Sequence, residues 1–196
     1  MSALEQLDLA VLDRINPDQP RPFLDGFFVF LTKPPHEVWI FVAAAVVLVA
    51  WGRRRGVVTL LTLGIAIALA DQISASVLKP LFDRVRPCFA HPEIVRLVLQ
   101  KQAHSASFPS SHAANSFAAA MVFRGMDRRL GWVMLGLAVL ISLSRPYVGV
   151  HYPSDIAVGA ALGAGIGWGV VRLRTLVGRR WRQLRIDPKK ETVPRG

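Results

Sequence analysis

Three short groups of residues carry the side chain types that chemistry on a phosphate group requires. The first group contains Lys79 and Arg86, the second contains Ser110, Ser111 and His112, and the third contains Arg145, His151 and Asp155. Lysine and arginine bind phosphate oxygens, and the planar guanidinium matches two oxygens at once. Histidine supplies a nucleophile or an acid near neutral pH, and a carboxylate can orient it. The groups therefore predict phosphate chemistry if the fold brings them into one pocket.

The spacing of His151 and Asp155 suits a nucleophile with an orienting partner. Because the two residues are four apart, the carboxylate can bond one ring nitrogen and present the other for attack. His112 supplies a second imidazole, placed to protonate a leaving oxygen. Three cations stabilise the equatorial oxygens of the transition state, so the set predicts phosphoryl transfer through a phosphohistidine without a magnesium ion.

The second group also predicts a helix start that binds an anion. Pro109 suits the first position of a helix, where its missing N–H costs nothing. Backbone N–H groups near Ser110 and Ser111 then point at the anion. The hydroxyl groups of the two serines can add further donors.

The composition predicts a membrane protein. Hydrophobic residues make up 52% of the 196 residues and charged residues only 19%, which is rich in apolar residues for a soluble protein. The formal net charge of +11 suits either nucleic acid or an anionic membrane surface. Because the basic residues lie at the ends of apolar runs, we expect the lipid bilayer and a membrane lipid as partners, and not nucleic acid. Cys88 is the one cysteine, which excludes an intramolecular disulfide and argues against a zinc site.

Five apolar stretches predict five membrane-spanning helices, with a sixth allowed. They cover residues 38–51, 57–78, 109–123, 130–143 and 156–171. Several fall short of the roughly 20 residues that cross a bilayer, and one further turn at each end closes the gap. We therefore expect an all-α fold, a polytopic membrane helix bundle in which residues 1–196 form a single domain.

Residues 1–35 predict helical segments at the membrane interface. Between residues 3 and 15, apolar residues recur at helical spacing, and acidic residues such as Asp8 and Asp13 suit a polar face. An ordinary surface helix is the alternative for this segment. The apolar run 23–31 is about half a bilayer long, so we expect a re-entrant or interfacial piece. A cleaved signal peptide is not expected, because no basic start precedes an apolar run.

Arginine placement predicts the orientation of the spans. Arginines cluster at residues 53–55, 124–129 and 172–185. With five alternating spans all three clusters fall on one face, which we expect to be cytoplasmic, together with the basic tail at 173–196. The loops 79–108 and 146–155 then share the opposite, extracytoplasmic face, so the three chemical groups meet there.

A few residues outside the three groups have structural interpretations. Glycines at positions 159, 163, 165, 167 and 169 predict close packing between helices. Asp71 is costly in lipid and is expected to form a hydrogen bond with a neighbouring helix. Asp83 and Arg84 can pair with each other near the site.

The three groups resemble the motifs of the type 2 phosphatidic acid phosphatase superfamily, which shares its helical core and active site with vanadium haloperoxidases. The matching patterns are Lys79-x6-Arg86-Pro87, Pro109-Ser110-Ser111-His112 and Ser144-Arg145-x5-His151-x3-Asp155. They occur in the order and with the internal spacing of that superfamily. In one departure, the second motif usually reads Pro-Ser-Gly-His, and Ser111 stands in place of the glycine. A backbone N–H survives this replacement, so the expected contact with an anion is little affected.

The resemblance implies an integral membrane lipid phosphatase or diphosphatase that uses no metal ion or other cofactor. It implies His151 as the nucleophile, Asp155 as its orienting partner, and His112 as the acid for the leaving group. It also implies the phosphate-binding residues Lys79, Arg86, Ser110, Ser111 and Arg145. The candidate substrates are a polyprenyl diphosphate such as undecaprenyl diphosphate, phosphatidylglycerophosphate, phosphatidic acid and the 1-phosphate of lipid A, met at the outer face of the cell (inner) membrane.

Two alternatives belong to other functional classes. A non-catalytic lipid-binding or lipid-flipping protein can keep the same fold, although binding alone does not require a nucleophile with an oriented partner. A soluble haloperoxidase is disfavoured by the apolar spans. Taken singly, a cation near a span end can be an interfacial anchor, and a serine or aspartate at a helix start can be a cap. The gathering of all these residues on the less basic face favours the catalytic interpretation.

Overall fold

The computed structural model describes residues 2–33, 54–102 and 104–186, together with positions 43, 46, 47, 49 and 50. All regular structure in these ranges is helical, which confirms the all-α prediction for this part of the chain. The elements are α1 (Ala3–Ile15), α2 (Pro22–Thr32), α4 (Arg54–Asp71), the π-helix η1 (Gln72–Leu78), α5 (Lys79–Phe82), α6 (Pro87–Ala90), α7 (Ser111–Met126), α8 (Arg128–Tyr147) and α9 (Pro153–Ile186). Apart from the five single positions, the predicted span at 38–51 lies outside the described residues, as does the tail after residue 186.

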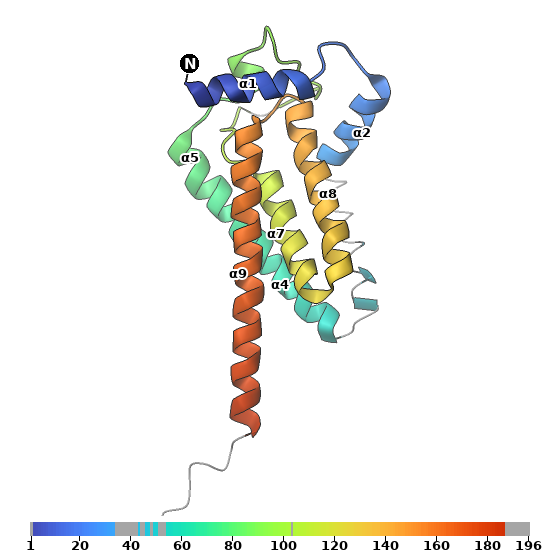
Figure 1. Ribbon diagram of the computed structural model, residues 1–196, viewed down its shortest axis with the longest axis vertical. Coiled ribbons are helices and arrows are strands. Elements are labelled where there is room, and N and C mark those ends of the chain that lie inside the picture. Colours follow the sequence, from blue (N-terminus) through green and yellow to red (C-terminus); the bar gives the residue numbers. More distant parts are fainter. Residues whose placement is uncertain are drawn as a thin grey trace, which may run out of the picture.

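The helices α4, α7, α8 and α9 form a bundle in which α7 packs against the other three (Figure 1). Small side chains make this central position possible, because Ala114, Ala118 and Ala119 of α7 are fully buried and let neighbouring helices approach closely. Phe123 and Met134 complete the same core further along the bundle. The bundle axis is therefore built on an alanine-rich helix rather than on large apolar side chains.

Three helical stretches in the described part of the chain are long and apolar enough to cross a membrane. They are Arg54–Ala90, Arg128–Tyr147 and Pro153–Trp181. The predicted span at 109–123 forms α7, whose 16 residues give a helix of about 24 Å, shorter than the hydrocarbon core of a bilayer. Large apolar side chains such as Leu61, Val133 and Trp168 are more than half exposed, as expected for a surface that faces lipid. The count of five or six spanning helices stays a prediction.

Glycines on one face of α9 allow its backbone to contact that of α7. A β-carbon at Gly159, Gly163 or Gly167 would collide with a backbone carbonyl of Ser110, Ala114 or Ala118 respectively. The three glycines are four residues apart, so they form one stripe along the helix. Gly165 and Gly169 face open space. Close packing is therefore confirmed for three of the five glycines.

The long helical stretch that starts with α4 changes its winding as it approaches the end of the bundle. In the π-helix η1, the amide of Lys79 donates to the carbonyl of Ser74, five residues earlier. Such wide turns are rare and commonly occur at functional sites. The helix then ends at Asp83, which adopts the left-handed conformation with φ 38°. The chain continues as an extended segment that carries Arg84 and Arg86.

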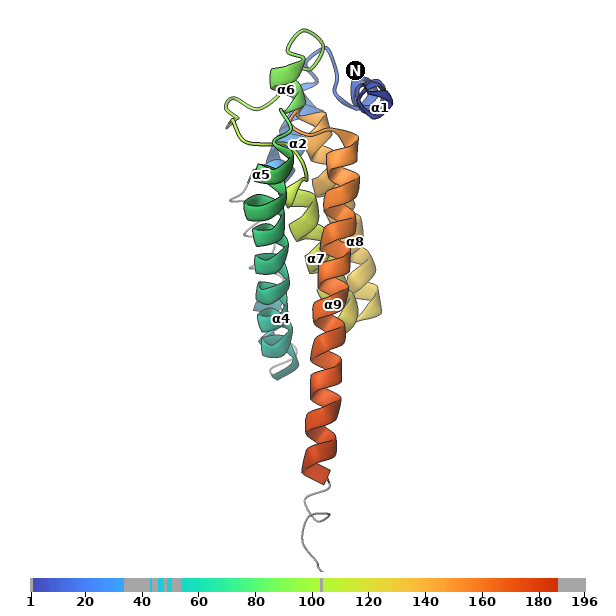
Figure 2. The same ribbon diagram turned by 90° about the vertical axis from the view of Figure 1, so that its left-hand side faces the viewer.

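The N-terminal helix α1 lies across the end of the bundle where α9 begins (Figure 1, Figure 2). It contacts α8 and α9, and its bounds agree with the sequence prediction. The prediction that Asp8 belongs to a polar face is wrong, because its side chain is buried with 3% exposure. Asp13 on the same helix is exposed, as expected. Asp8 turns inward because it has partners at the start of α9.

The short helix α2 is fixed to the same end of the bundle by a polar cluster. Asp25 accepts from Arg96 at 2.8 and 3.0 Å and from the hydroxyl of Tyr147 at 2.7 Å. The hydrogen bonds from Arg96 contribute most to lowering the pKa of Asp25 to about 2, and the bond from Tyr147 adds to this shift, although desolvation opposes it. Asn16, just after α1, donates to the carbonyls of Arg96 and Tyr147. Both N-terminal helices are thereby attached to the end of α8 that leads to His151.

Candidate active site

A cavity of about 620 Å³ lies at this end of the bundle, and we call it the His151 cavity. Six of the eight predicted site residues line it: Lys79, Arg86, Ser111, His112, Arg145 and His151. Two further cations, Lys33 and Lys101, also line it, and none of the described lining residues is acidic. The cavity is therefore built to hold an anion.

The predicted residues lie at or next to the ends of helices. Lys79 begins α5, Arg86 precedes α6, and Arg145 lies in the last turn of α8. Ser111 and His112 open α7. His151 and Asp155 lie in the turn before α9 and in its first turn. Residues at helix ends that meet at one end of a bundle converge without any long loop.

His151 is held between a carboxylate and a guanidinium. Its Nδ1 lies 3.3 Å from Oδ2 of Asp155, and its Nε2 lies 3.2 Å from Nη1 of Arg86. Because a guanidinium only donates, Nε2 must present its lone pair, and the ring proton of a neutral imidazole then sits on Nδ1 facing Asp155. His151 is 1% exposed and Asp155 is fully buried, so the pair is shielded from bulk water. The unprotonated nitrogen is thus the one on the cavity side.

The surroundings of His151 keep its ring neutral. Burial lowers the pKa of His151 well below its usual value of 6.5, and the positive charges of Arg145, Arg86 and Lys79 lower it further. A neutral imidazole is the nucleophilic form. The same cations that suppress its protonation attract an anionic substrate into the cavity.

Two arginines of the cavity are fixed by backbone contacts. Arg86, 4% exposed, donates to the carbonyl of Ser105 at 2.9 Å, to its hydroxyl at 2.9 Å, and to the carbonyl of Val150 at 3.0 Å. Arg145, 5% exposed, donates to the carbonyl and hydroxyl of Thr32 at the end of α2. The two charges are therefore positioned in advance of any ligand.

The start of α7 differs from the sequence prediction. Pro109 was expected at the first helical position, but α7 begins at Ser111 and Ser110 is its N-cap. The hydroxyl of Ser110 accepts from the amide of Ala113 at 3.4 Å, and its own amide donates to the carbonyl of Asp155 at 3.0 Å. Ser110 is fully buried and does not line the cavity. Ser111 does line it, and its hydroxyl contacts that of Ser74 at 2.9 Å.

Arg84 has partners that the sequence did not suggest. It forms ion pairs with Asp8 at 2.7 Å and with Asp155 at 2.8 Å, instead of pairing with Asp83. No local pattern connects Arg84 to Asp8, because the two residues are 76 positions apart. Asp71, by contrast, behaves as expected and accepts from Asn115 of the neighbouring helix α7 at 3.3 Å.

The outer part of the cavity combines apolar and polar side chains. Val29 of α2 and Val98 and Leu99 of the loop after α6 form an apolar wall. Lys33 and Lys101 are exposed cations on the same rim. Sequence reasoning did not identify Lys33. Within the described ranges, no three histidine, cysteine or acidic side chains are grouped to hold a metal ion.

Residues 57–179 match the family model of the PAP2 superfamily, the type 2 phosphatidic acid phosphatases that the sequence motifs resemble. The chain belongs to this superfamily. Among its PAP2 relatives, a lipid A 4'-phosphatase of Bacteroides thetaiotaomicron is 32% identical over 75% of this chain and 68% of its own length. An undecaprenyl-diphosphatase of Sulfolobus acidocaldarius is 33% identical over 78% of this chain and 71% of its own length.

Solved PAP2 structures share the fold. The crystal structure of Aquifex aeolicus LpxE matches with a TM-score of 0.66 and 26% identity, over 85% of this chain and 95% of that chain. A phosphatidylglycerolphosphate phosphatase of Bacillus subtilis matches in fold with a TM-score of 0.65 and 20% identity, over 98% of this chain and 90% of that chain. With these relatives and the three apolar helical stretches, the chain is a phosphatase and a multi-pass membrane protein.

Proposed function

We propose that this PAP2 phosphatase hydrolyses a phosphate or diphosphate group on a membrane lipid through a phosphohistidine at His151. One observation carries the proposal: a buried, neutral imidazole presents Nε2 to a cavity lined by cations, while Asp155 faces its Nδ1. This is the arrangement that a nitrogen nucleophile toward phosphorus requires.

In the first step, Nε2 of His151 attacks phosphorus as the bond to the leaving oxygen breaks. His112, at the cavity wall, takes up a proton from solvent as the phosphate dianion binds, and this imidazolium gives the proton to the leaving oxygen. His151 keeps its Nδ1 proton and donates it in a hydrogen bond to Asp155, whose negative charge offsets the positive charge that develops on the ring. The N–H of Arg86 that faced Nε2 becomes available to a phosphate oxygen.

In the second step, water attacks the phosphohistidine with its proton taken up by His112, the nitrogen–phosphorus bond breaks, and inorganic phosphate leaves. Lys79, Arg86 and Arg145 stabilise the equatorial oxygens in both steps. The backbone N–H of Ser111 adds a donor at the start of α7. Ser110 supports this donor as the cap of the helix, and its assignment to phosphate binding rests on the superfamily motif.

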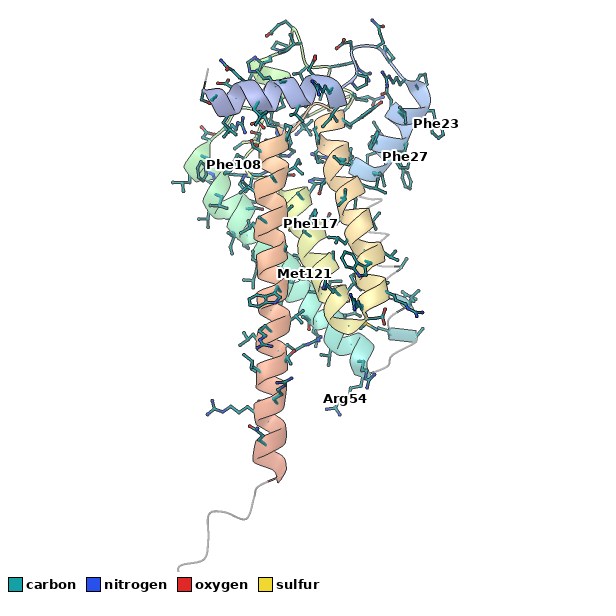
Figure 3. The ribbon with its side chains drawn as sticks, in the orientation of Figure 1. Phe23, Phe27, Arg54, Phe108, Phe117 and Met121 are labelled. Atoms are coloured by element: carbon teal, nitrogen blue, oxygen red, sulfur yellow. The ribbon has the colours of Figure 1, made fainter. Side chains whose placement is uncertain are left out.

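The cavity favours a substrate with a second anionic group. Lys33 and Lys101, both exposed, line the cavity in addition to the three cations that surround His151. A polyprenyl diphosphate such as undecaprenyl diphosphate, or phosphatidylglycerophosphate, supplies such a second group, whereas phosphatidic acid does not. The exposed rings of Phe23, Phe27 and Phe30 on α2 offer an apolar surface for the lipid tail. Phe23 and Phe27 are labelled in Figure 3.

The proposed location is the cell membrane, with the His151 cavity on the extracytoplasmic face and the C-terminus in the cytoplasm. Arg54 lies at the end of the bundle opposite α1 (Figure 3). Arg54, Arg55 and Arg174 line a second cavity of about 610 Å³ there. A basic end of this kind belongs on the cytoplasmic side. Residues 1–196 are proposed to act as one domain.

The experiment is phosphate release by the purified protein in detergent from four lipids: undecaprenyl diphosphate, phosphatidylglycerophosphate, phosphatidic acid and lipid A. We expect release from at least one substrate with a second anionic group, and loss of that release in His151→Ala. His104→Ala, in an exposed loop, is the matched control and should retain activity.

Two outcomes would contradict the proposal. Equal release by His151→Ala and the wild type would exclude His151 as the nucleophile. No release from any of the four lipids by folded protein would favour a non-catalytic lipid-binding or lipid-flipping protein. The metal-free mechanism predicts full activity after exhaustive treatment with EDTA, and activity that returns only with added magnesium would contradict it.

A further inference from the structure

The extended segment after α5 connects the N-terminal helix to the candidate catalytic pair. Arg84 donates from Nη2 to Oδ2 of Asp8 on α1 at 2.7 Å, and from Nη1 to Oδ1 of Asp155 on α9 at 2.8 Å. One guanidinium thus bridges two carboxylates from opposite parts of the chain. Its rigid, planar donor geometry fixes both carboxylates at once.

The two oxygens of Asp155 have separate partners. Oδ2 faces Nδ1 of His151 at 3.3 Å and accepts from the amide of Tyr152 at 2.9 Å. Oδ1 accepts from Arg84. Because the Arg84 bond fixes the rotation of the carboxylate, it also fixes the oxygen that faces His151.

Asp8 holds Arg84 within a closed set of contacts. Its Oδ1 accepts from the amide of Ser154 at 2.9 Å, and its Oδ2 accepts from the hydroxyl of Ser154 at 2.5 Å. The same hydroxyl accepts from Arg84 at 2.8 Å. The guanidinium also lies 3.8 Å from the centre of the Tyr152 ring. These contacts attach α1 to the residues that flank His151 and Asp155.

Burial and charge make the set interdependent. Asp8 is 3% exposed and Asp155 is fully buried, so each needs an opposite charge or hydrogen bonds to remain ionised. Arg84 supplies both, and Asp8 offsets the positive charge of Arg84. Asp155 therefore keeps its strength as an acceptor for the Nδ1 proton. Neither Asp8 nor Arg84 lines the His151 cavity, so neither touches a phosphate bound there.

We propose that Asp8 and Arg84 are positioning residues of the reaction, through which the docking of α1 orients Asp155 and thereby His151. This inference rests on the proposed function, in which His151 is the nucleophile. The interfacial helix then completes the site without contacting substrate. Loss of either residue leaves phosphate binding intact, but Asp155 no longer holds the imidazole of His151 in the orientation that attack requires.

The test measures kcat and KM of full-length variants in detergent with the fastest of the four lipids named above. Asp8→Asn keeps the size of the side chain and removes its charge, and Arg84→Lys keeps the charge and removes the planar donor pair. We expect each to lower kcat about 10- to 100-fold, by analogy with the loss of the hydrogen-bonded partner of a metal-binding histidine, with KM changed less than about twofold. The kcat of the double variant should be no lower than that of the less active single variant, because both residues act through one carboxylate.

The controls separate this inference from the proposed function. Asp13→Asn removes the same charge from the exposed face of α1 and should leave kcat unchanged. If His151→Ala keeps wild-type turnover, the proposed function fails. If His151→Ala is inactive while Asp8→Asn turns over at the wild-type rate, only the positioning role fails.

A purely structural role for the cluster gives different results. Asp8→Asn would then lower the melting temperature while its folded fraction kept the wild-type kcat, which would overturn the proposal. Losses that multiply in the double variant would overturn it as well, because they would show two independent effects. A variant Asp8→Asn that does not fold at all would assign the cluster to stability and would also overturn it.

Discussion

At the scale of single residues, the chemistry of His151 comes from its neighbours. Nε2 faces Arg86, Nδ1 faces Asp155, and burial among cations lowers the pKa of the ring well below 6.5. The imidazole is thus neutral at physiological pH, while the residues around it carry positive charges that favour binding of an anion. In the proposed function the substrate phosphate supplies negative charge and relieves the repulsion among the cations.

The lowered pKa of His151 predicts a loss of stability on the acid side. In the unfolded chain the imidazole takes up a proton near its usual value of about 6.5, whereas in the folded protein it does so only at lower pH. Below pH 6.5 the unfolded state binds more protons than the folded state. The free energy of unfolding therefore decreases as the pH is lowered, by at most about 1.4 kcal/mol per pH unit. The melting temperature of His151→Gln minus that of the wild type should therefore rise as the pH is lowered from about 7.5 to 5.5. A difference in melting temperature that does not change with pH would contradict this.

The candidate site residues were predictable because each motif lies at a helix end on one side of the bundle. Alternation of the spans was enough to bring His112, Arg145 and His151 together. Lys33 was missed because it follows a short helix outside the motifs. Arg84 was placed near the site, but its partner Asp8 was not predicted, because a contact across 76 residues leaves no local pattern.

At the scale of elements, periodic spacing predicted where helices lie, and specific hydrogen bonds decided how they begin and wind. The bounds of α1 agree with its apolar spacing. Helix α7 begins at Ser111 and not at the predicted Pro109, because the hydroxyl of Ser110 caps the helix. The π-helix η1 before Lys79 was not predicted, since its residues fit an ordinary helical pattern equally well.

The glycine stripe between α9 and α7 predicts a sharp difference between neighbouring positions. Gly163→Ala places a methyl group against the carbonyl of Ala114, so α7 and α9 must separate, at a cost of about 1–3 kcal/mol. Gly165→Ala is the matched control, because its methyl group meets open space and alanine favours the helix. Melting temperatures in detergent should fall for the first and hold or rise for the second. Equal melting temperatures for both variants would contradict the packing.

At the scale of the whole molecule, charge divides the bundle into two ends. Helix α1 lies across the end of the bundle where α9 begins (Figure 2), and His151, which lines the His151 cavity, directly precedes α9. The arginines of the second cavity lie at the other end. By the positive-inside rule, the proposed orientation puts the arginine-rich end in the cytoplasm. In that orientation we expect a lipid phosphate to reach the site from the outer leaflet while its tail stays beside the apolar helices.

This orientation predicts which residues are accessible from outside an intact cell. In a Cys88→Ala background, a cysteine at exposed Glu93 should react with a membrane-impermeant maleimide. A cysteine at exposed Arg179 of α9 should react only after the cells are permeabilised. The reverse labelling pattern would place the His151 cavity in the cytoplasm.

The most direct test of the central claim is to trap the phosphoenzyme. Purified protein is mixed with a lipid substrate labelled with ³²P in the phosphate that is released, quenched with base within one turnover, and digested for mass spectrometry. The account predicts an acid-labile, base-stable phosphate on His151, absent from His151→Ala. A protein that turns over substrate with no label on His151, or with label on another residue, would contradict it.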